Sequence, residues 1–310
     1  MFIDNPGSGG LLEAIPYYMI IQEDGTRSEA PFPISASARL GHQLDGSVID
    51  LHSRVRYLPN GMIDPSFTVI EGSENPNDGF PEMLVEFNDK LYFAGSATGF
   101  FGYDSEGIIA LNKDGSLYRK YDVIPAGSYV TKIAAQADGG ILVAGNFSFD
   151  GEDETKHLLR ISPDGTLDES FTTNAFLENL DASAVDDIAV DGNDTIYVSG
   201  YSEITFGFGV VRLNPDGTLD DAYPSVVFGY DGNGVTSNLL NILPDNTLMV
   251  AGNFSECNGV EIRSVVRLDQ SGEIMPMENV AFGGRTSATF AGYAPGSLYM
   301  IRYFSNPDFT

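Results

Sequence analysis

Short apolar runs separated by turn residues recur along the whole chain. Segments such as 139–145 and 194–200 are rich in β-branched and aromatic residues and are bounded by Gly, Asp and Asn. This composition is typical of short β-strands. No stretch sustains apolar residues at i, i+3, i+4 and i+7, the spacing of an amphipathic helix. The pattern therefore predicts an all-β protein with almost no helix.

Two sequence signatures alternate along the chain. The first is a turn with flanking strands, and residues 161–171 (ISPDGTLDESF) and 213–223 (LNPDGTLDDAY) are near copies of it. Its turn glycines, spaced by 36, 54, 50, 52 and 55 residues, are Gly25, Gly61, Gly115, Gly165, Gly217 and Gly272. The second is an apolar strand that ends in glycine, as in 139–145 and 246–252. Each period then holds about four short strands, which is the signature of a β-propeller blade.

The two ends of the chain each carry half a period. Residues 15–32 contain only the last two strands of the pattern, and residues 286–304 contain only the first two. The complete periods are 36–67, 83–121, 131–172, 186–224 and 239–278. We therefore expect one domain, residues 15–310, that forms a six-bladed β-propeller with one blade shared between the N- and C-termini. A five-bladed ring with a longer N-terminal arm is the alternative, and residues 1–14 are expected to be a flexible arm in either case.

The turn sequence fixes a register for the hairpin that contains it. If Asn214 and Thr218 close the turn, Gly217 takes the left-handed conformation that a type I turn with a G1 bulge requires. The same register gives three facing pairs, which are Arg212 with Asp220, Arg160 with Asp168, and Arg56 with Asp64. Because blades pack on both faces, we expect these pairs to form partly buried cross-strand ion pairs.

Other copies of the hairpin lack this pair. The register places Ala110 opposite Tyr118 and Ile20 opposite Ser28, so arginine and aspartate are absent together. Arg267 is the exception, because it faces Met275.

The repeat resembles that of a known family, the delta-60 repeat β-propellers. It consists of a strand, a glycine-bounded apolar strand and the motif R-[LI]-x-P-D-G-[ST]-L-D-x-[SA]-F. The similarity is closest at 130–171 and 186–223, and it is good at 239–272. Such repeats occur in bacterial surface proteins and in structural proteins of tailed bacteriophages. The resemblance implies a propeller fold and brings no catalytic residues with it.

Charge and composition exclude several classes of function. With 16 basic and 44 acidic residues the net charge is −28, so no basic stripe is available to neutralise nucleic-acid phosphates or an anionic membrane surface. No apolar run reaches the roughly 20 residues of a membrane span, and we expect no membrane insertion. The first basic residue is Arg27, so no secretory signal peptide is expected. Cys257, the single cysteine, has no partner for an internal disulfide.

Candidate catalytic groups are few. The three histidines, His42, His52 and His157, lack metal-ligand spacing. Cys257 has no histidine near it in sequence to act as a base. Neither a G-x-S-x-G elbow nor a phosphate-binding G-x-x-x-x-G-K-[ST] loop is present. We therefore expect no catalytic residues and no enzyme activity.

Acidic loops offer oxygen ligands for calcium. The segments 150–154, 186–187, 191–194 and 231–234 are rich in carboxylates, but none completes an EF-hand loop. We expect solvated turns, no bound metal and no cofactor, with calcium as the alternative.

The central channel of a propeller is lined by the first strand of each blade. The residues that these strands offer are Arg39, Glu82, Lys132, Asp186, Asn238 and Arg285. A wet, polar channel is expected. Convergence of Glu82, Asp186 and Asn238 on a cation would instead indicate a metal-dependent, lactonase-like hydrolase.

Aromatic residues fall in two kinds of position. Phe67, Tyr121, Phe171 and Tyr223 end the fourth strands and are expected to pack between blades. A second set lies in connections between the second and third strands, namely Phe100, Phe101, Tyr103, Phe206 and Phe208. If the second set is exposed, it forms a surface for a partner or a sugar. If these loops instead fold over the blade edge, the same residues belong to the core. Both alternatives stay open.

These observations favour a non-catalytic scaffold or binding protein. The resemblance indicates a structural component of a tailed-phage virion, on the tail, baseplate, a fibre or the capsid, assembled in the host cytoplasm. Its expected partners are other virion proteins in a symmetric assembly, and a host cell-surface glycan or protein. The alternatives are a carbohydrate-binding surface lectin and the metal-dependent hydrolase, because fold alone does not determine function.

Overall fold

The computed structural model is built from β-strands. It describes residues 19–22, 27–29, 40–67, 79–95, 99–151, 155–173, 185–202, 207–229, 236–243, 245–262, 265–276, 287–294 and 297–303. These residues contain 26 strands and no helix, as the sequence predicts. In particular, no helix in these ranges is long and apolar enough to cross a membrane.

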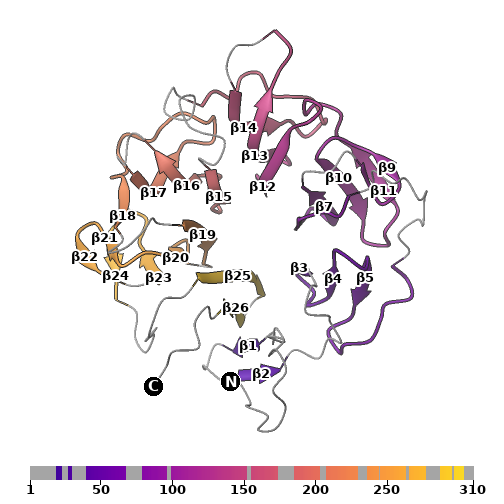
Figure 1. The fold of residues 1–310 in the computed structure, drawn as a ribbon, viewed down its shortest axis with the longest axis horizontal. Helices are drawn as coiled ribbons and strands as arrows, with labels where there is room; N and C mark the ends of the chain where they lie inside the picture. The colour runs from indigo at the N-terminus through magenta and orange to yellow at the C-terminus, as the bar shows by residue number, and fades with distance from the viewer. Residues whose placement is uncertain are drawn as a thin grey trace, which may run out of the picture.

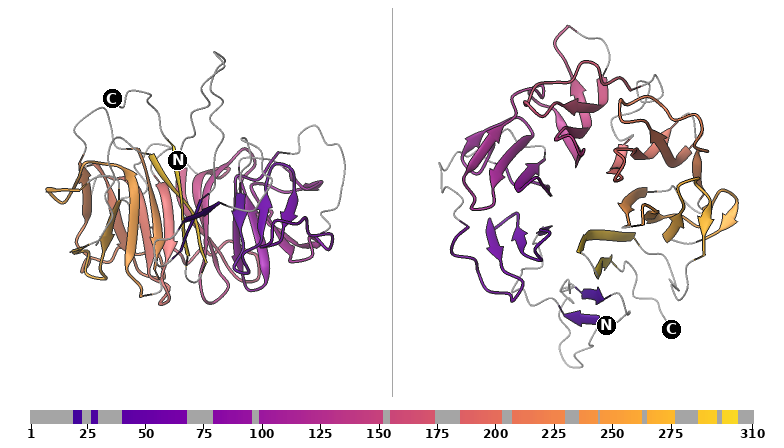
Figure 2. Two further views of the ribbon diagram at one scale, coloured as in Figure 1. Left: turned by 90° about the horizontal axis from the view of Figure 1, so that it is seen from below. Right: turned by 180° about the vertical axis from the view of Figure 1, so that it is seen from behind.

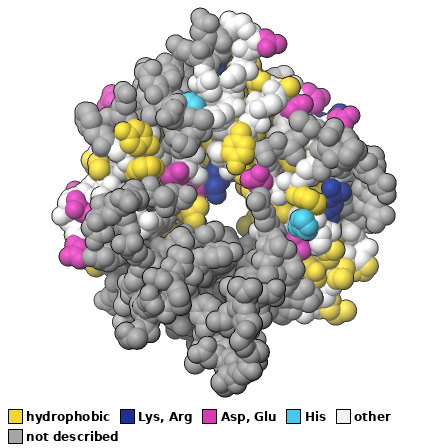
Figure 3. All heavy atoms as spheres, viewed as in Figure 1, with side chains coloured by type: hydrophobic (Ala, Val, Ile, Leu, Met, Phe, Trp, Pro, Cys, Tyr) yellow, Lys and Arg dark blue, Asp and Glu magenta, His cyan; other side chains and the backbone are white. Residues whose placement is uncertain are grey.

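The strands form six sheets of three or more strands that stand around a central opening (Figures 1 and 3). From the side, the strands run along the short axis of the molecule (Figure 2). The first three of these sheets in chain order are β3 (Leu40–His42), β4 (Val48–Asp50) and β5 (Val55–Tyr57); β6 (Met83–Phe87), β7 (Lys90–Ala94), β10 (Ile108–Asn112) and β11 (Leu117–Lys120); and β12 (Tyr129–Ala135), β13 (Ile141–Ser148) and β14 (Thr155–Ile161).

The next two sheets are larger or share strands. One contains β15 (Val185–Val190), β16 (Ile196–Ser202), β17 (Gly207–Leu213), β18 (Val226–Gly229), β21 (Glu256–Cys257) and β22 (Val260–Glu261). The other contains β19 (Thr236–Ile242), β20 (Leu248–Asn253), β23 (Val265–Leu268) and β24 (Ile274–Met275). A separate two-stranded hairpin consists of β8 (Gly99–Phe100) and β9 (Tyr103–Asp104).

The remaining sheet joins the two ends of the chain. Its strand order is β2 (Arg27–Glu29), β1 (Met19–Gln22), β26 (Ser297–Tyr303) and β25 (Ser287–Ala294). Strands β1 and β26 are antiparallel, with Ile20 opposite Tyr299. The predicted pairing of residues 15–32 with 286–304 is therefore present. The expected arm, residues 1–14, lies outside the described residues.

In several repeats the last of the expected short strands is irregular. In the sheets of β5, β14 and β17 the segment after the turn joins through single bridges, Tyr57 with Ile63, Ile161 with Leu167 and Leu213 with Leu219. The sheet that begins with β15 instead continues through β18 to β21, which belongs to the following repeat. Two neighbouring repeats thus share one hydrogen-bonded ladder at their outer edge.

The predicted register is present where the turn sequence is strong and fails at one hairpin. Leu213 faces Leu219 and Ile20 faces Ser28, as expected. Ala110, however, faces Arg119 and not Tyr118, because a bulge shifts the pairing between Ala110 and Leu111. The turn glycines of the described repeats all have positive φ, between 82° and 92°, and are Gly61, Gly115, Gly165, Gly217 and Gly272. Gly25 lies outside the described residues.

Apolar cores fill the seams between neighbouring sheets. Tyr121, Phe171, Tyr223 and Phe67 each pack against a cluster made from two successive sheets, as expected for the aromatic residues after the turn. Burying one large apolar side chain stabilises the fold by about 1.5–3 kcal/mol. The seam between sheets, rather than the interior of a single sheet, is therefore where most of the packing energy arises.

Candidate functional site

The repeated arginine of the third strand contacts the aspartate that faces it. Arg212 Nη2 lies 2.7 Å from Asp220 Oδ2, and Arg160 Nη1 contacts Asp168 Oδ2. Arg56 Nε lies 3.5 Å from Asp64 Oδ2, which is ion-pair distance, although Nε makes no hydrogen bond. All three expected guanidinium–carboxylate contacts are present.

A second carboxylate reaches the same arginine from the turn between the first and second strands. Arg56 Nη2 lies 3.0 Å from Asp45 Oδ2, and Arg160 Nη2 binds Asp138 in the same way. Arg267, which faces a methionine across its hairpin, pairs with the turn residue Asp245 instead. These turn aspartates are not among the residues expected from the sequence. Their signal is a repeated Asp followed by Gly or Asn, at 45–46, 138–139 and 245–246.

Arginine and glutamine side chains of this region also bind the next sheet along the chain. The acceptor is in each case the backbone carbonyl at the second position of the turn that follows the third strand, two residues before the turn glycine. Four successive sheets use it, through Arg56 Nη1 to Lys113 O at 2.7 Å, Arg119 Nη1 to Pro163 O at 3.0 Å, Gln136 Nε2 to Pro215 O at 3.4 Å and Arg212 Nη1 to Gln270 O at 2.6 Å. We call these four contacts the inter-sheet latches.

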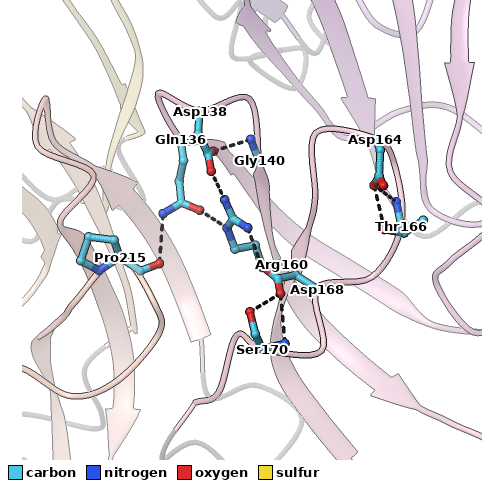
Figure 4. A network of polar contacts seen from close by, with 9 residues as sticks. All are labelled: Gln136, Asp138, Gly140, Arg160, Asp164, Thr166, Asp168, Ser170 and Pro215. Carbon is cyan, nitrogen blue, oxygen red and sulfur yellow. Dashed lines mark hydrogen bonds and ion pairs between the residues drawn. The ribbon is translucent and has the colours of Figure 1, made fainter.

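Figure 4 shows the latch of the sheet β12–β14. Arg160 lies between Asp138 and Asp168 and donates through Nε to Gln136 Oε1 at 2.6 Å. Gln136 in turn donates to Pro215 of the neighbouring sheet. The turn that recurs in these repeats therefore has two roles, because it closes its own hairpin and presents a backbone carbonyl to the preceding sheet.

Hydrogen bonds hold these carboxylates in the charged state. Asp168 accepts from the backbone N–H and the hydroxyl of Ser170, and these bonds, followed by Arg160, lower its pKa. Burial disfavours the charged form of Arg160, but its hydrogen bonds to Asp168 and Asp138 outweigh burial and raise its pKa. The pair is therefore ionised on both sides at neutral pH, as a partly buried pair must be to remain satisfied.

One latch leaves a pocket. A cavity of about 160 Å³ lies beside Arg212, where the sheet of β15–β18 meets the turn of the next sheet at Gln270. The residues that line it are Asp191, Asn193, Thr195, Tyr197, Arg212, Asn214, Pro215, Asp220 and Gln270. It was not identified from the sequence, because its residues come from four separate segments.

Of the two alternatives for the loop aromatics, Phe100 and Phe101 follow the buried one. Phe100 and Phe101 are 0% and 1% exposed, because the β8–β9 hairpin folds its connection back over the sheet edge. Phe101 packs edge-to-face on Phe93 with ring centroids 4.7 Å apart, and Tyr103 packs against the same cluster. Phe208 is half-buried and packs against the neighbouring core. Phe206 lies outside the described residues.

At the axis, the polar contacts differ from the expected set. Lys132 Nζ lies 3.4 Å from Asp187 Oδ1, and Asp187 Oδ2 accepts from Leu240 N at 2.9 Å. Asp187, not Asp186, therefore ties three successive sheets, because a bulge between Val185 and Asp187 shifts the pairing of β15. Figure 3 shows basic and acidic side chains at the described rim of the opening.

The other axial candidates are described only in part. Glu82 precedes β6, and Asn238 falls where a bulge interrupts β19. Arg39 and Arg285 lie outside the described residues. Across the described ranges, no three His, Cys, Asp or Glu side chains gather closely enough to hold a metal ion.

Two side chains of reactive type, those of His157 and Cys257, are buried in the fold. His157 is buried, with Nδ1 3.2 Å from Gly145 O. Cys257 is fully buried in β21, and burial raises the pKa of its thiol to about 12. A nucleophilic cysteine needs the opposite shift, since the thiolate is the reactive form.

Comparison with known proteins supports the repeat assignment. A family model described as a "domain of unknown function (DUF5122) beta-propeller" matches residues 136–171, 192–223 and 243–274. The first match runs from Gln136 to Phe171 and so includes Gln136, Asp138, Arg160 and Asp168, while Pro215, the acceptor of the Gln136 latch, lies in the second match. A search of curated proteins finds no match.

Solved structures share the fold at low identity. An extracellular domain assigned provisionally to a hybrid two-component system of B. thetaiotaomicron has a TM-score of 0.53 at 12% identity, over 93% of this chain and 41% of that chain. A candidate 6-phosphogluconolactonase of Bacteroides fragilis has a TM-score of 0.50 at 13% identity, over 94% of this chain and 89% of that one. The chain thus spans well under half of the first protein. The fold and the matched repeats together identify this chain as a β-propeller repeat protein.

Proposed function

We propose that this chain is a non-catalytic scaffold that binds other proteins in a larger assembly, and that its most specific role is as a structural protein of a tailed-phage virion. The inter-sheet latches are the observation that carries the proposal. Arg56, Arg119, Gln136 and Arg212 all bind the turn of the next sheet. The recurring polar side chains thus serve to join sheets into one stiff body, which is the property a scaffold requires.

The proposal includes a closed ring of six blades. In this arrangement β25, β26, β1 and β2 form the blade shared between the termini, supported by the antiparallel pairing of β1 with β26. Joining the ends removes exposed sheet edges, which otherwise template aggregation. Deletion of residues 1–32 is therefore expected to make the chain aggregate, as measured by light scattering. A monomeric, equally stable truncated chain would contradict the shared blade.

The proposed partners are other virion proteins, with a host-surface glycan or protein as the external target. A net charge of −28 favours neutral or basic partner surfaces. Several copies in a symmetric particle would multiply weak contacts into strong attachment. The proposed location is accordingly the tail, baseplate, a fibre or the capsid surface of a particle assembled in the host cytoplasm.

Purified particles test this role directly. Virions from the strain whose genome encodes the chain are banded on a density gradient and analysed by mass spectrometry. Peptides of this chain should band with the tail or capsid proteins at a constant ratio. Recovery of the chain only from the unassembled fraction would contradict the proposal.

The hydrolase alternative has its own measurement. The purified chain is assayed with lactone and ester substrates, with and without a chelator. Turnover at the background rate agrees with a scaffold. Enzyme-like turnover that chelation abolishes would replace the scaffold with a metal-dependent hydrolase.

A further inference from the structure

Two residues of one turn distinguish the repeat that carries the pocket beside Arg212. The turn hydrogen bonds of Gln136, Asp191 and Leu243 align the turns between the first and second strands of three successive sheets. In this alignment Asn193 occupies the position of Asp138 and Asp245, which pair with Arg160 and Arg267. An amide at position 193 cannot make that ion pair, and the cavity of about 160 Å³ lies between Asn193 and Arg212.

This turn still carries a carboxylate, but at a different position from that of Asp138. Asp191 occupies the position that Gln136 holds in the preceding sheet. Its Oδ1 accepts from the backbone N–H groups of Asn193, at 2.8 Å, and Thr195, at 2.9 Å. Both hydrogen bonds that its carboxylate accepts from described residues end on Oδ1, so Oδ2 keeps its capacity to accept.

Donors face the same cavity. The guanidinium of Arg212 has five N–H groups. Three of them are used, through Nε and Nη2 to Asp220 and through Nη1 to Gln270 O. The Asn193 side chain has no hydrogen bond to another described residue, and it offers both a donor and an acceptor.

We infer that this pocket binds one neutral sugar residue, such as the terminal pyranose of a glycan. Each sugar hydroxyl donates one hydrogen bond and accepts others, which suits a wall that offers both Asp191 Oδ2 and the N–H groups of Arg212 and Asn193. Pockets for drug-sized ligands begin at about 300 Å³, so a cavity of about 160 Å³ takes a single ring.

Charge disfavours the other ligand classes. A free anion would lie against the carboxylates of Asp191 and Asp220 in a protein of net charge −28. A metal cation would find one carboxylate not paired with Arg212, that of Asp191, and the described residues hold no group of three acidic, His or Cys side chains around the cavity. A neutral polyol needs neither a cluster of cations nor a cluster of carboxylates. This inference does not depend on the scaffold role, because the assembly can form whether or not the pocket is occupied.

Ligand-detected NMR on the full-length chain tests the inference. The probes are the methyl pyranosides of glucose, galactose and mannose, with glucuronate as an anionic comparison. We expect saturation transfer to at least one neutral pyranoside. Asn193→Asp should restore the ion pair to Arg212 and weaken binding at least about tenfold. Thr195→Val, which removes a hydroxyl from the pocket wall, should weaken it as well.

The matched control is Asp245→Asn, which makes the reverse change in the next sheet and should leave sugar binding unaltered. Absence of transfer to all three neutral pyranosides would overturn the inference. Equal binding by the Asn193→Asp variant, with a native circular dichroism spectrum, would show that the sugar binds elsewhere. Binding of glucuronate in preference to the neutral sugars would show an anion site and would also overturn it.

Discussion

The sheets β12–β14 and β15–β18 carry nearly the same turn sequence but end in different sites. Ser162–Thr166 and Asn214–Thr218 both close a turn with Pro-Asp-Gly-Thr, and both follow an arginine that pairs across the hairpin. Arg160 is contacted by Asp138, Asp168 and Gln136, and its side chain is 12% exposed. Arg212 has Asp220 on one side and a cavity on the other.

The difference comes from a turn about 20 residues earlier in the chain. Asp138 and Asn193 occupy equivalent turn positions, and only the carboxylate can pair with the arginine. The Pro-Asp-Gly-Thr turn, which is strongly repeated, determines the hairpin and its inter-sheet latch. The turn that contains Asp138 or Asn193 is weakly repeated, and it determines whether the arginine contacts a second carboxylate or borders a cavity.

Removing the arginines should give the largest effect and should rank the two sheets. Arg160→Ala leaves Asp138 and Asp168 without a cation, so we expect a loss of about 2–4 kcal/mol in the free energy of unfolding. Arg212→Ala leaves one such carboxylate, Asp220, and should cost about 1 kcal/mol less. Urea unfolding measures both, and Lys120→Ala at an exposed strand end should change stability by less than about 0.5 kcal/mol. Equal costs for the two arginines would contradict the difference described here.

Glycine substitutions should separate backbone strain from contact between sheets. Gly165 and Gly151 have φ of 92° and 86°, so alanine at either position costs about 1–2 kcal/mol in strain. A Cβ at Gly165 would also lie 2.6 Å from Arg119 Nη1, whereas a Cβ at Gly151 meets nothing within 4 Å. Gly165→Ala should therefore be more destabilising than Gly151→Ala in urea unfolding. The same cost at both positions would mean that the Arg119 latch adjusts freely.

The fold followed from the sequence because its signals are local and repeated. The positive φ of Gly165 and Gly217 and the pairing of Arg212 with Asp220 depend on residues within one hairpin. The pairing of the chain ends followed from counting half periods, which is a consequence of repetition and not of any single residue.

The site was harder to predict because its contacts join separate segments. The partner of Arg212 Nη1 is a backbone carbonyl 58 residues away, and side-chain identity carries no signal for such an acceptor. Bulges at Ala110 and Val185 shift the register by one residue. As a result Arg119, and not the predicted Tyr118, faces Ala110, and Asp187, and not the predicted Asp186, makes the contacts near the axis. The loop aromatics Phe100 and Phe101 are buried by a hairpin whose strands are too short to stand out in the sequence.

Exchanging the turn residues should partly interconvert the two sheets. Asp138→Asn removes one carboxylate from Arg160 and should lower the free energy of unfolding by about 1 kcal/mol. Asn193→Asp adds a carboxylate beside Arg212 and should raise it by up to about 1 kcal/mol. Thermal or urea unfolding of both variants measures the exchange. Destabilisation by Asn193→Asp would show that repulsion between the new carboxylate and Asp191 outweighs its attraction to Arg212.

Acid should reduce the difference between the wild-type chain and the Arg160→Ala variant. Asp168 has a pKa below its ordinary value of 3.8, because of Ser170 first and Arg160 second. A carboxyl whose pKa is lower in the folded chain stabilises the fold above its unfolded pKa, and this contribution is lost as pH falls through the folded pKa. The Arg160→Ala variant keeps the Ser170 bonds and loses only the contribution from the arginine. Its deficit in the free energy of unfolding should be constant from pH 7 to about 5 and should shrink below pH 3.8. Urea unfolding at pH 7, 5, 3.5 and 2.5 measures it, and a deficit that stays constant to pH 2.5 would show that Arg160 stabilises this sheet by packing and not by its charge.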